Sequence, residues 1–171
     1  MKLSEIINNL HVGSVTDAQL ALNKGGGAVL SIGAEFSKND AQDEFFDNVY
    51  IPLRNKSGCN WKLISLWDGQ PGSITKYLKE AWKFIDDNIE KGPVLVHCMA
   101  GKSRSASVVW SYMLYKGKDP LDAYWILKKN RPVVDPYPEF LREILTAFKY
   151  NDNRVEELIQ QIKDLNGMMK K

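Results

Sequence analysis

The chain has 171 residues, 44% of them hydrophobic and 26% charged, a composition typical of one soluble globular domain with a sizeable core. A formal net charge of +2 does not by itself indicate a nucleic acid or a membrane surface as partner. The two cysteines, Cys59 and Cys98, are too few for a disulfide framework or a Cys-rich zinc site.

His11 and His97 do not lie at metal-ligand spacing from either cysteine, so no metal and no cofactor are expected. The first residues lack the apolar core of an export signal, and no apolar run is long enough to span a bilayer. Lys2 stands where N-myristoylation needs a glycine. We therefore expect a cytoplasmic protein without a membrane partner, and access to the nucleus stays open.

Short apolar runs alternate with helical patterns in the first half of the chain. Strands are expected at residues 10–13, 28–32 and 48–53. A helix over 17–23 joins the first two of these strands. Glycines 25–27 follow this helix and precede a strand, which is the reverse of the order in a phosphate loop. We interpret them as the end of the helix and a turn.

The second half begins with a predicted helix over 74–89, which Ser73 can cap and which Lys91-Gly-Pro93 ends. The fully apolar run 94–96 predicts a buried central strand. Further helices are expected over 106–115, 120–130 and 138–148. This alternation of strands and helices predicts an α/β layered domain.

The tail from Asn151 has a different pattern. Asn153-Arg-Val-Glu156 resembles a capping box, and an apolar stripe follows that ends at Gly167. The stripe consists of Val155, Leu158, Ile159, Ile162 and Leu165. It fits a helix docked on its own domain, and it also fits a helix for self-association or partner binding. We predict a main domain over 1–150 and a C-terminal amphipathic helix or tail over 151–171.

The stretch 94–110, VLVHCMAGKSRSASVVW, predicts a strand, a loop of small residues and a helix, a layout that directs backbone N–H groups at an anion. Its Gly101-Lys-Ser103 matches the end of a nucleotide-binding loop. The leading glycine of such a loop would have to be residue 96, which is Val96. The nucleotide interpretation is therefore set aside.

A cysteine-based interpretation fits every position of the same stretch. Five residues separate Cys98 from Arg104, and Ser105 follows the arginine. Hydrolysis of a phosphate monoester is very slow without catalysis, so it needs a strong nucleophile together with charge stabilisation. Loop N–H groups and a helix N-terminus favour the thiolate. Small Ala100 and Gly101 let the loop curl, and an arginine can hold two phosphate oxygens at once.

His97-Cys-Met-Ala-Gly-Lys-Ser-Arg-Ser105 resembles the signature loop of the cysteine-dependent protein tyrosine phosphatase superfamily, specifically its atypical dual-specificity branch. Leu10-His-Val-Gly-Ser14, Val49-Tyr-Ile-Pro52 and a downstream Ala-x-x-x-Leu-x-x-x-Arg-Pro helix are also similar to that family. The resemblance covers roughly residues 4–149. It implies a central, mostly parallel, twisted sheet of four to five strands flanked by helices, with residues 1–150 as the catalytic domain.

The resemblance also implies a role for each residue of the site. Cys98 would attack phosphorus and form a phosphocysteine, and Ser105 would help the sulfur leave in the second step. His97 would support the thiolate from below, and Asp68 would serve as acid and then as base. The phosphoryl oxygens would be bound by Arg104 and the N–H groups of Met99, Ala100, Gly101, Lys102, Ser103 and Arg104.

The sequence also suggests roles for four residues outside the signature loop. Asp68 lies in a Gly/Pro-containing loop thirty residues before the cysteine, and a simple turn residue before a helix would have the same pattern. Arg131 is interpreted as a helix-end charge and Cys59 as a bystander. Tyr137 stands where many relatives have an asparagine, so bracing of the loop is expected to differ.

The leading hypothesis is a phosphatase of phosphotyrosine, phosphoserine and phosphothreonine in proteins. The chain lacks the segment that deepens the pocket of tyrosine-specific relatives, and a shallow pocket admits the shorter esters. One alternative is a non-protein substrate: a phosphoinositide or other phospholipid, a phosphorylated glucan or an RNA 5′ phosphate. Another is a catalytically silent phospho-binding module. Phosphorylated proteins are the expected partners, and no nucleic acid is expected as one.

Overall fold

The computed structural model describes residues 4–33, 55, 59–67 and 74–169. In these residues five strands form one sheet in the order β1-β2-β5-β3-β4. The strands are β1 (Ser4–Ile7), β2 (Leu10–Gly13), β3 (Ala28–Ile32), β4 (Asn60–Ile64) and β5 (Val94–His97). Only the β1–β2 pair is antiparallel within the described sheet; the other neighbours are parallel. The predicted mostly parallel sheet is confirmed, and the apolar run 94–96 is its central strand.

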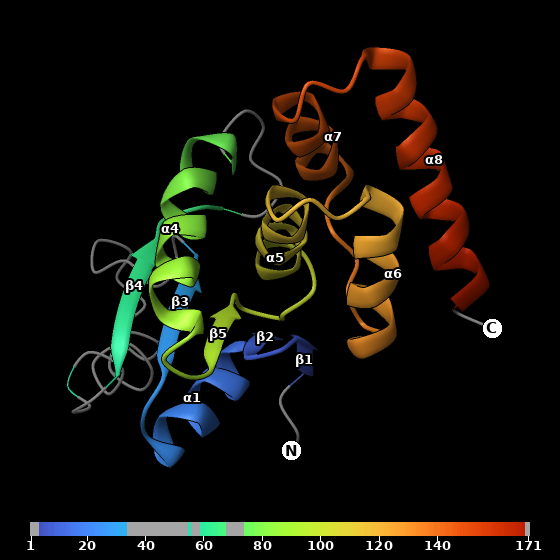
Figure 1. The fold of residues 1–171 in the computed structure, drawn as a ribbon. Helices are drawn as coiled ribbons and strands as arrows, with labels where there is room; N and C mark the ends of the chain where they lie inside the picture. Colours follow the sequence, from blue (N-terminus) through green and yellow to red (C-terminus); the bar gives the residue numbers. More distant parts are fainter. Residues whose placement is uncertain (1–3, 34–54, 56–58, 68–73, 170–171) are drawn as a thin grey trace.

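Helices cover both faces of the sheet (Figure 1). α1 (Val15–Lys24) lies on one face against β2 and β5. α4 (Leu78–Ile89) and α5 (Arg104–Tyr115) pack on the opposite face, where three more helices extend the layer. These are α6 (Pro120–Asn130), α7 (Pro138–Ala147) and α8 (Asp152–Met169).

The core divides between the two faces because successive side chains of a strand point in opposite directions. Leu30 of β3 and Val96 of β5 belong to the large core under α4 and α5. Val29 and Leu95, their neighbours in sequence, contact Ala18 of α1 on the other side. α5 is buried along almost its whole length, in keeping with apolar residues on all sides of this helix.

Several elements differ from the sequence expectation. β1 and β4 are strands that the sequence analysis did not predict. The helix expected over 74–89 begins as a 3-10 turn, Ile74–Tyr77, before α4. α8 continues past Gly167 to Met169, because a glycine in an exposed helix costs only about 1 kcal/mol. The strand expected at 48–53 and the cap at Ser73 lie outside the described residues.

α8 packs against α6 and α7 (Figure 1). Its apolar stripe belongs to the domain core. Val155, Leu158, Ile159 and Ile162 of this stripe are buried, and Leu165 is partly buried against the same core. The stripe is thus occupied within the chain, as the docked-helix interpretation expects. The domain boundary near residue 150 stays a prediction.

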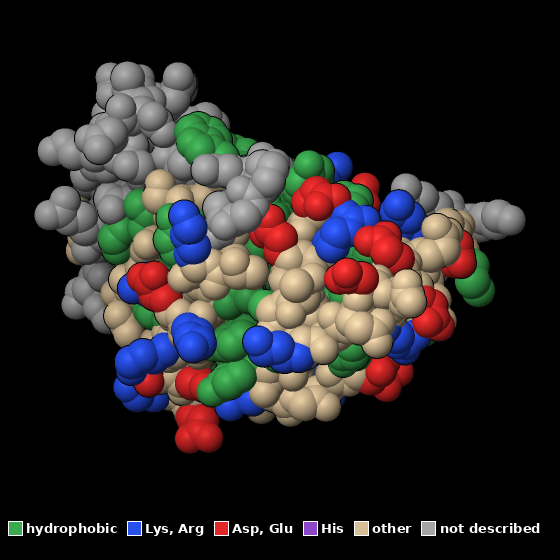
Figure 2. All heavy atoms as spheres, turned by 90° about the horizontal axis from the view of Figure 1, so that it is seen from above, with side chains coloured by type: hydrophobic (Ala, Val, Ile, Leu, Met, Phe, Trp, Pro, Cys, Tyr) green, Lys and Arg blue, Asp and Glu red, His purple; other side chains and the backbone are tan. Residues whose placement is uncertain are grey.

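The surface is mixed in charge. Figure 2 shows basic and acidic side chains interspersed over the described part of one face, in keeping with the small net charge. Among the helices of the described ranges, none has the length and apolar character needed to cross a membrane.

Candidate active site

The loop between β5 and α5 lies at the carboxyl end of the parallel strands. β2 ends at Gly13 and β5 at His97, so the loops after both strands meet at this edge of the sheet. The N–H of Val15 donates to the carbonyl of Met99 at 3.0 Å, and the N–H of Cys98 contacts the Gly13 carbonyl at 3.4 Å. Ligands of open α/β sheets bind at this edge.

His97 is completely buried below the loop. Its Nδ1 lies 3.2 Å from the Cys98 carbonyl, and its Nε2 lies 2.6 Å from the Ser31 hydroxyl. Burial lowers the pKa of His97 to about 4, helped by the nearby Arg104 charge and opposed by the Cys98 carbonyl and by Asp17. The imidazole is therefore neutral at pH 7.

The tautomer of His97 follows from its neighbours. A carbonyl only accepts hydrogen bonds, so Nδ1 carries the proton and donates it to Cys98, and Nε2 accepts one from Ser31. The indole N–H of Trp61 donates to the same Ser31 hydroxyl at 3.1 Å. A chain of three side chains from β3, β4 and β5 thus fixes the peptide that follows the cysteine.

Cys98 lies at the base of the loop with 2% of its surface exposed. Its Sγ is 3.2 Å from the Oγ of Ser105 in the first turn of α5. Arg104 starts the same helix and is 7% exposed, and its Nη1 donates to the Leu66 carbonyl at 3.1 Å. The structure thus places Cys98 next to Ser105, with Arg104 at the start of the same helix, as the spacing predicts for a strand–loop–helix unit.

The carbonyls of residues 98–102 all accept hydrogen bonds from outside the loop backbone. The donors are, in order along the loop, the His97 ring, the Val15 N–H, the Arg131 guanidinium twice and the Asp135 N–H. In a trans peptide the N–H points away from the C=O. The N–H groups of residues 99–103 therefore point away from these donors, toward the side of the loop on which a nest for an anion would form.

Ser103 precedes α5 as its N-cap residue but makes no side-chain bond to the first-turn N–H groups. Its hydroxyl instead accepts the N–H of Tyr137 at 2.9 Å. The N–H of Asp135 donates to the Lys102 carbonyl at 2.8 Å. The segment with the unusual Tyr137 therefore braces the loop through its backbone, which does not depend on the side chain at this position.

Arg131 lies at the end of α6, as the sequence analysis expected, but it also contacts the loop, which was not expected. Its Nε donates to the Gly101 carbonyl at 2.8 Å, and its side chain is only 13% exposed. The sequence analysis missed this contact because Gly101 lies thirty residues earlier in the chain, beyond any helical periodicity. The Arg-Pro pair of the family-like motif was the one signal in the sequence that singled out this arginine.

Sequence reasoning also missed Asp17, Ser31 and Trp61, which lie under or beside the loop. Asp68 lies outside the described residues, so the structure says nothing of it. Cys59 is partly exposed, and its Sγ contacts the Asn60 carbonyl at 3.8 Å. Within the described ranges, no group of three or more His, Cys, Asp or Glu side chains could hold a metal ion.

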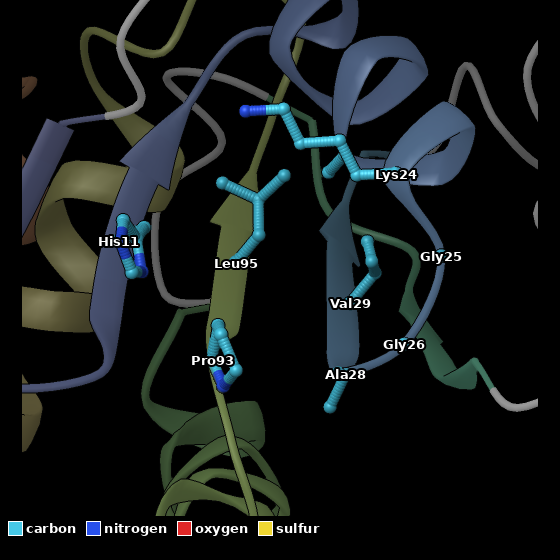
Figure 3. Close-up of a pocket in the computed structure, with 10 residues that line it drawn as sticks. His11, Lys24, Gly25, Gly26, Ala28, Val29, Pro93 and Leu95 are labelled. Carbon is cyan, nitrogen blue, oxygen red and sulfur yellow. The ribbon is translucent and has the colours of Figure 1, made fainter.

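A separate hollow of about 290 Å³ lies on the α1 face of the sheet (Figure 3). Val29, Leu95 and Pro93 line it together with the backbone of glycines 25–27, and His11 and Lys24 border it. Pro93 precedes β5 and Cys98 follows it. This hollow is therefore at the opposite end of the strand from the candidate site and does not belong to it.

Comparisons with known proteins agree with this fold and site, and they cover nearly the whole chain. Residues 11–166 match the family described as "Dual specificity phosphatase, catalytic domain". The crystal structure of DUSP15 has a TM-score of 0.64 and 27% sequence identity, and the alignment covers 95% of each chain. A human tyrosine phosphatase-like serine/threonine/tyrosine-interacting protein has a TM-score of 0.67 at 23% identity, with 86% of this chain and 95% of that chain covered.

Two relatives show that the matching proteins differ widely in length. The putative tyrosine phosphatase 123R of invertebrate iridescent virus 6 is 28% identical over 84% of this chain and 90% of its own length. The dual specificity protein phosphatase YVH1 of Plasmodium falciparum is 33% identical over 61% of this chain, a match that spans only 19% of the relative. The match over residues 11–166 and the strand–loop–helix site agree, and this chain belongs to the dual-specificity phosphatase catalytic-domain family.

Proposed function

We propose that the protein hydrolyses phosphotyrosine and phosphoserine or phosphothreonine monoesters in proteins. The observation that carries this proposal is the loop of residues 98–102, whose carbonyls all accept hydrogen bonds from outside the loop backbone. The inner side of such a loop offers N–H donors to an anion that sits above a thiol. The dual-specificity names of the relatives support protein phosphoesters as substrates over non-protein ones.

The first step would be attack of the Cys98 thiolate on phosphorus. The S–P bond forms, the bond from phosphorus to the ester oxygen breaks, and the leaving oxygen takes a proton from Asp68. Arg104 and the loop N–H groups would stabilise the charge on the phosphoryl oxygens. Asp68 is proposed for this role from its place in the sequence, in a Gly/Pro-containing loop thirty residues before Cys98.

In the second step, water would attack the phosphocysteine while Asp68 accepts its proton. The S–P bond breaks and the thiolate is restored, with inorganic phosphate as the product. The 3.2 Å contact of Ser105 with Sγ supports a hydroxyl that stabilises the departing sulfur. His97 stays neutral and holds the Cys98 peptide, so it takes no part in proton transfer.

The test is hydrolysis of an aryl phosphate without added metal by the wild type, Cys98→Ser, Asp68→Ala and the control Cys59→Ser. We expect Cys98→Ser to be inactive, Asp68→Ala to be slow with an altered pH profile, and Cys59→Ser to match the wild type. Substantial activity in Cys98→Ser would refute the assignment of Cys98 as the nucleophile. An inactive wild type that still binds phosphopeptides would instead support the phospho-binding alternative.

A panel of phosphopeptides and phosphoinositides then tests the substrate class. We expect turnover of phosphotyrosine and phosphothreonine peptides and slower turnover of phosphoinositides. The proposed thiolate nucleophile needs a reducing compartment, so we also propose the cytoplasm as the location.

A further inference from the structure

Arg131 connects three parts of the fold on the outer side of the loop. Besides the 2.8 Å bond from Nε to Gly101, its Nη2 makes a longer contact of 3.5 Å with the Ala100 carbonyl. Its Nη1 donates to the Ser4 hydroxyl of β1 at 3.0 Å. The guanidinium at the end of α6 is thus fixed by the loop on one side and by the edge of the sheet on the other.

Asp17 holds the guanidinium in this position. Its Oδ2 lies 3.6 Å from Nη1 of Arg131, and its side chain is only 3% exposed. The same oxygen accepts the N–H of Ser14 at 2.8 Å and its hydroxyl at 3.1 Å. The hydrogen bonds with Ser14 hold the buried Asp17 carboxylate in one position. The carboxylate therefore determines the orientation of the Arg131 guanidinium.

Two glycines allow these groups to come so close. A Cβ on Gly13 would lie 2.7 Å from the Cβ of Asp17. A Cβ on Gly101 would lie 2.5 Å from Nη2 of Arg131 and 2.6 Å from the carbonyl carbon of Gly13. Gly101 also has a φ of 67°, which favours glycine. The loop, the Gly13 turn and the guanidinium therefore pack directly on one another.

The contacts of Arg131 act on the peptides that follow Ala100 and Gly101. Their carbonyls accept from the guanidinium, so their N–H groups, those of Gly101 and Lys102, are held toward the inner side of the loop. A charged donor on the carbonyl also polarises the peptide and makes its N–H a stronger donor. Both effects prepare the loop for an oxyanion before it arrives.

We propose that Arg131, oriented by Asp17, is a positioning residue that holds the Gly101 and Lys102 N–H groups toward the bound phosphoryl group. As a statement about catalysis, this inference rests on the proposed function. A lysine offers a single point of donation where the guanidinium reaches Gly101, Ala100 and Ser4, so it can restore the brace only in part.

The test uses a Cys59→Ser background, in which Cys98 is the single thiol. The variants are Arg131→Met, Arg131→Lys and Asp17→Asn, with Arg154→Met as the matched control, because the Arg154 side chain forms an ion pair with Glu157 of the same helix, α8. The first readout is protection of Cys98 from iodoacetate by inorganic phosphate, which measures anion binding without turnover. The second is kcat/KM for an aryl phosphate, and thermal unfolding monitors folding.

We expect Arg131→Met to weaken phosphate protection and to lower kcat/KM, each roughly 10- to 100-fold, as is usual when an outer hydrogen-bonding partner of a site is removed. Arg131→Lys should recover part of the loss, Asp17→Asn should show a smaller loss, and Arg154→Met should match the background protein. If Arg131→Met does not fold, the inference is tested with Arg131→Lys and Asp17→Asn in the same two assays.

A purely structural role predicts a different result. Variants that unfold at lower temperature but keep phosphate protection and kcat/KM within twofold of the background would overturn the inference. Failure of the proposed function is recognised separately. In that case the background protein hydrolyses no phosphoester, while phosphate protection still depends on Arg131.

Discussion

Acidification is expected to destabilise the folded protein through one buried imidazole, that of His97. Its pKa is about 4 in the folded state and 6.5 in the unfolded chain. Between these values the unfolded chain binds a proton that the folded protein does not, so the free energy of unfolding falls as the pH falls. From pH 7.5 to pH 5 the loss from His97 is about 2 kcal/mol.

The assay is urea unfolding of the wild type and His97→Asn at several pH values between 7.5 and 5. Asparagine can still donate a hydrogen bond to the Cys98 carbonyl, but it does not titrate. We expect the wild type to lose about 2 kcal/mol more than His97→Asn over this range. His11→Asn is the matched control. Because it retains His97, it should keep the loss of about 2 kcal/mol that His97 causes between pH 7.5 and pH 5.

Equal losses in the wild type and His97→Asn would refute the reasoning. That outcome would mean that His97 becomes protonated in the folded protein at about the same pH as in the unfolded chain. The buried chain through Ser31 and Trp61 would then have to accept a charged imidazole.

Three further predictions concern packing around the site and the tail. Gly101→Ala places a Cβ against Arg131 at a positive φ, so we expect a loss of about 2–4 kcal/mol in urea unfolding and weaker phosphate protection; unchanged stability would contradict the close approach. Ser31→Ala removes the hydrogen bonds to the buried His97 ring and to the partly buried Trp61 indole and should cost about 1–3 kcal/mol, measured in the same way. Leu158→Ala should cost about 2–5 kcal/mol because this side chain is buried in the core, whereas the exposed control Lys163→Ala should stay within about 0.5 kcal/mol. A neutral Leu158→Ala would show that α8 does not stabilise the domain.

The elements that the sequence predicts well are those whose own residues determine them. The run 94–96 is apolar at every position because β5 is covered on both faces. α6 has its Asp119 cap and a proline at its first position, and it spans the expected residues 120–130. Cys98, Arg104 and Ser105 come together because one loop joins β5 to α5.

The missed elements depend on distant partners. β4 runs from an exposed Asn60 to a buried Ile64 without alternation, so only pairing with β3 makes it a strand. The role of Arg131 depends on Gly101 and Ser4, and no periodicity relates residues so far apart. The bracing of the loop is likewise a property of the tertiary structure rather than of the signature.

The donors that fix the loop carbonyls have a consequence for folding. They come from β5, from the start of α1, from the end of α6 and from residue 135, and the Arg131–Ser4 bond closes a separation of 127 residues. A fragment spanning residues 94–115 would contain the whole signature but none of the donors from the rest of the chain. The bracing of the loop is therefore complete only when α1 and the end of α6 have packed against it, and we expect phosphate binding at Cys98 to report on this tertiary packing.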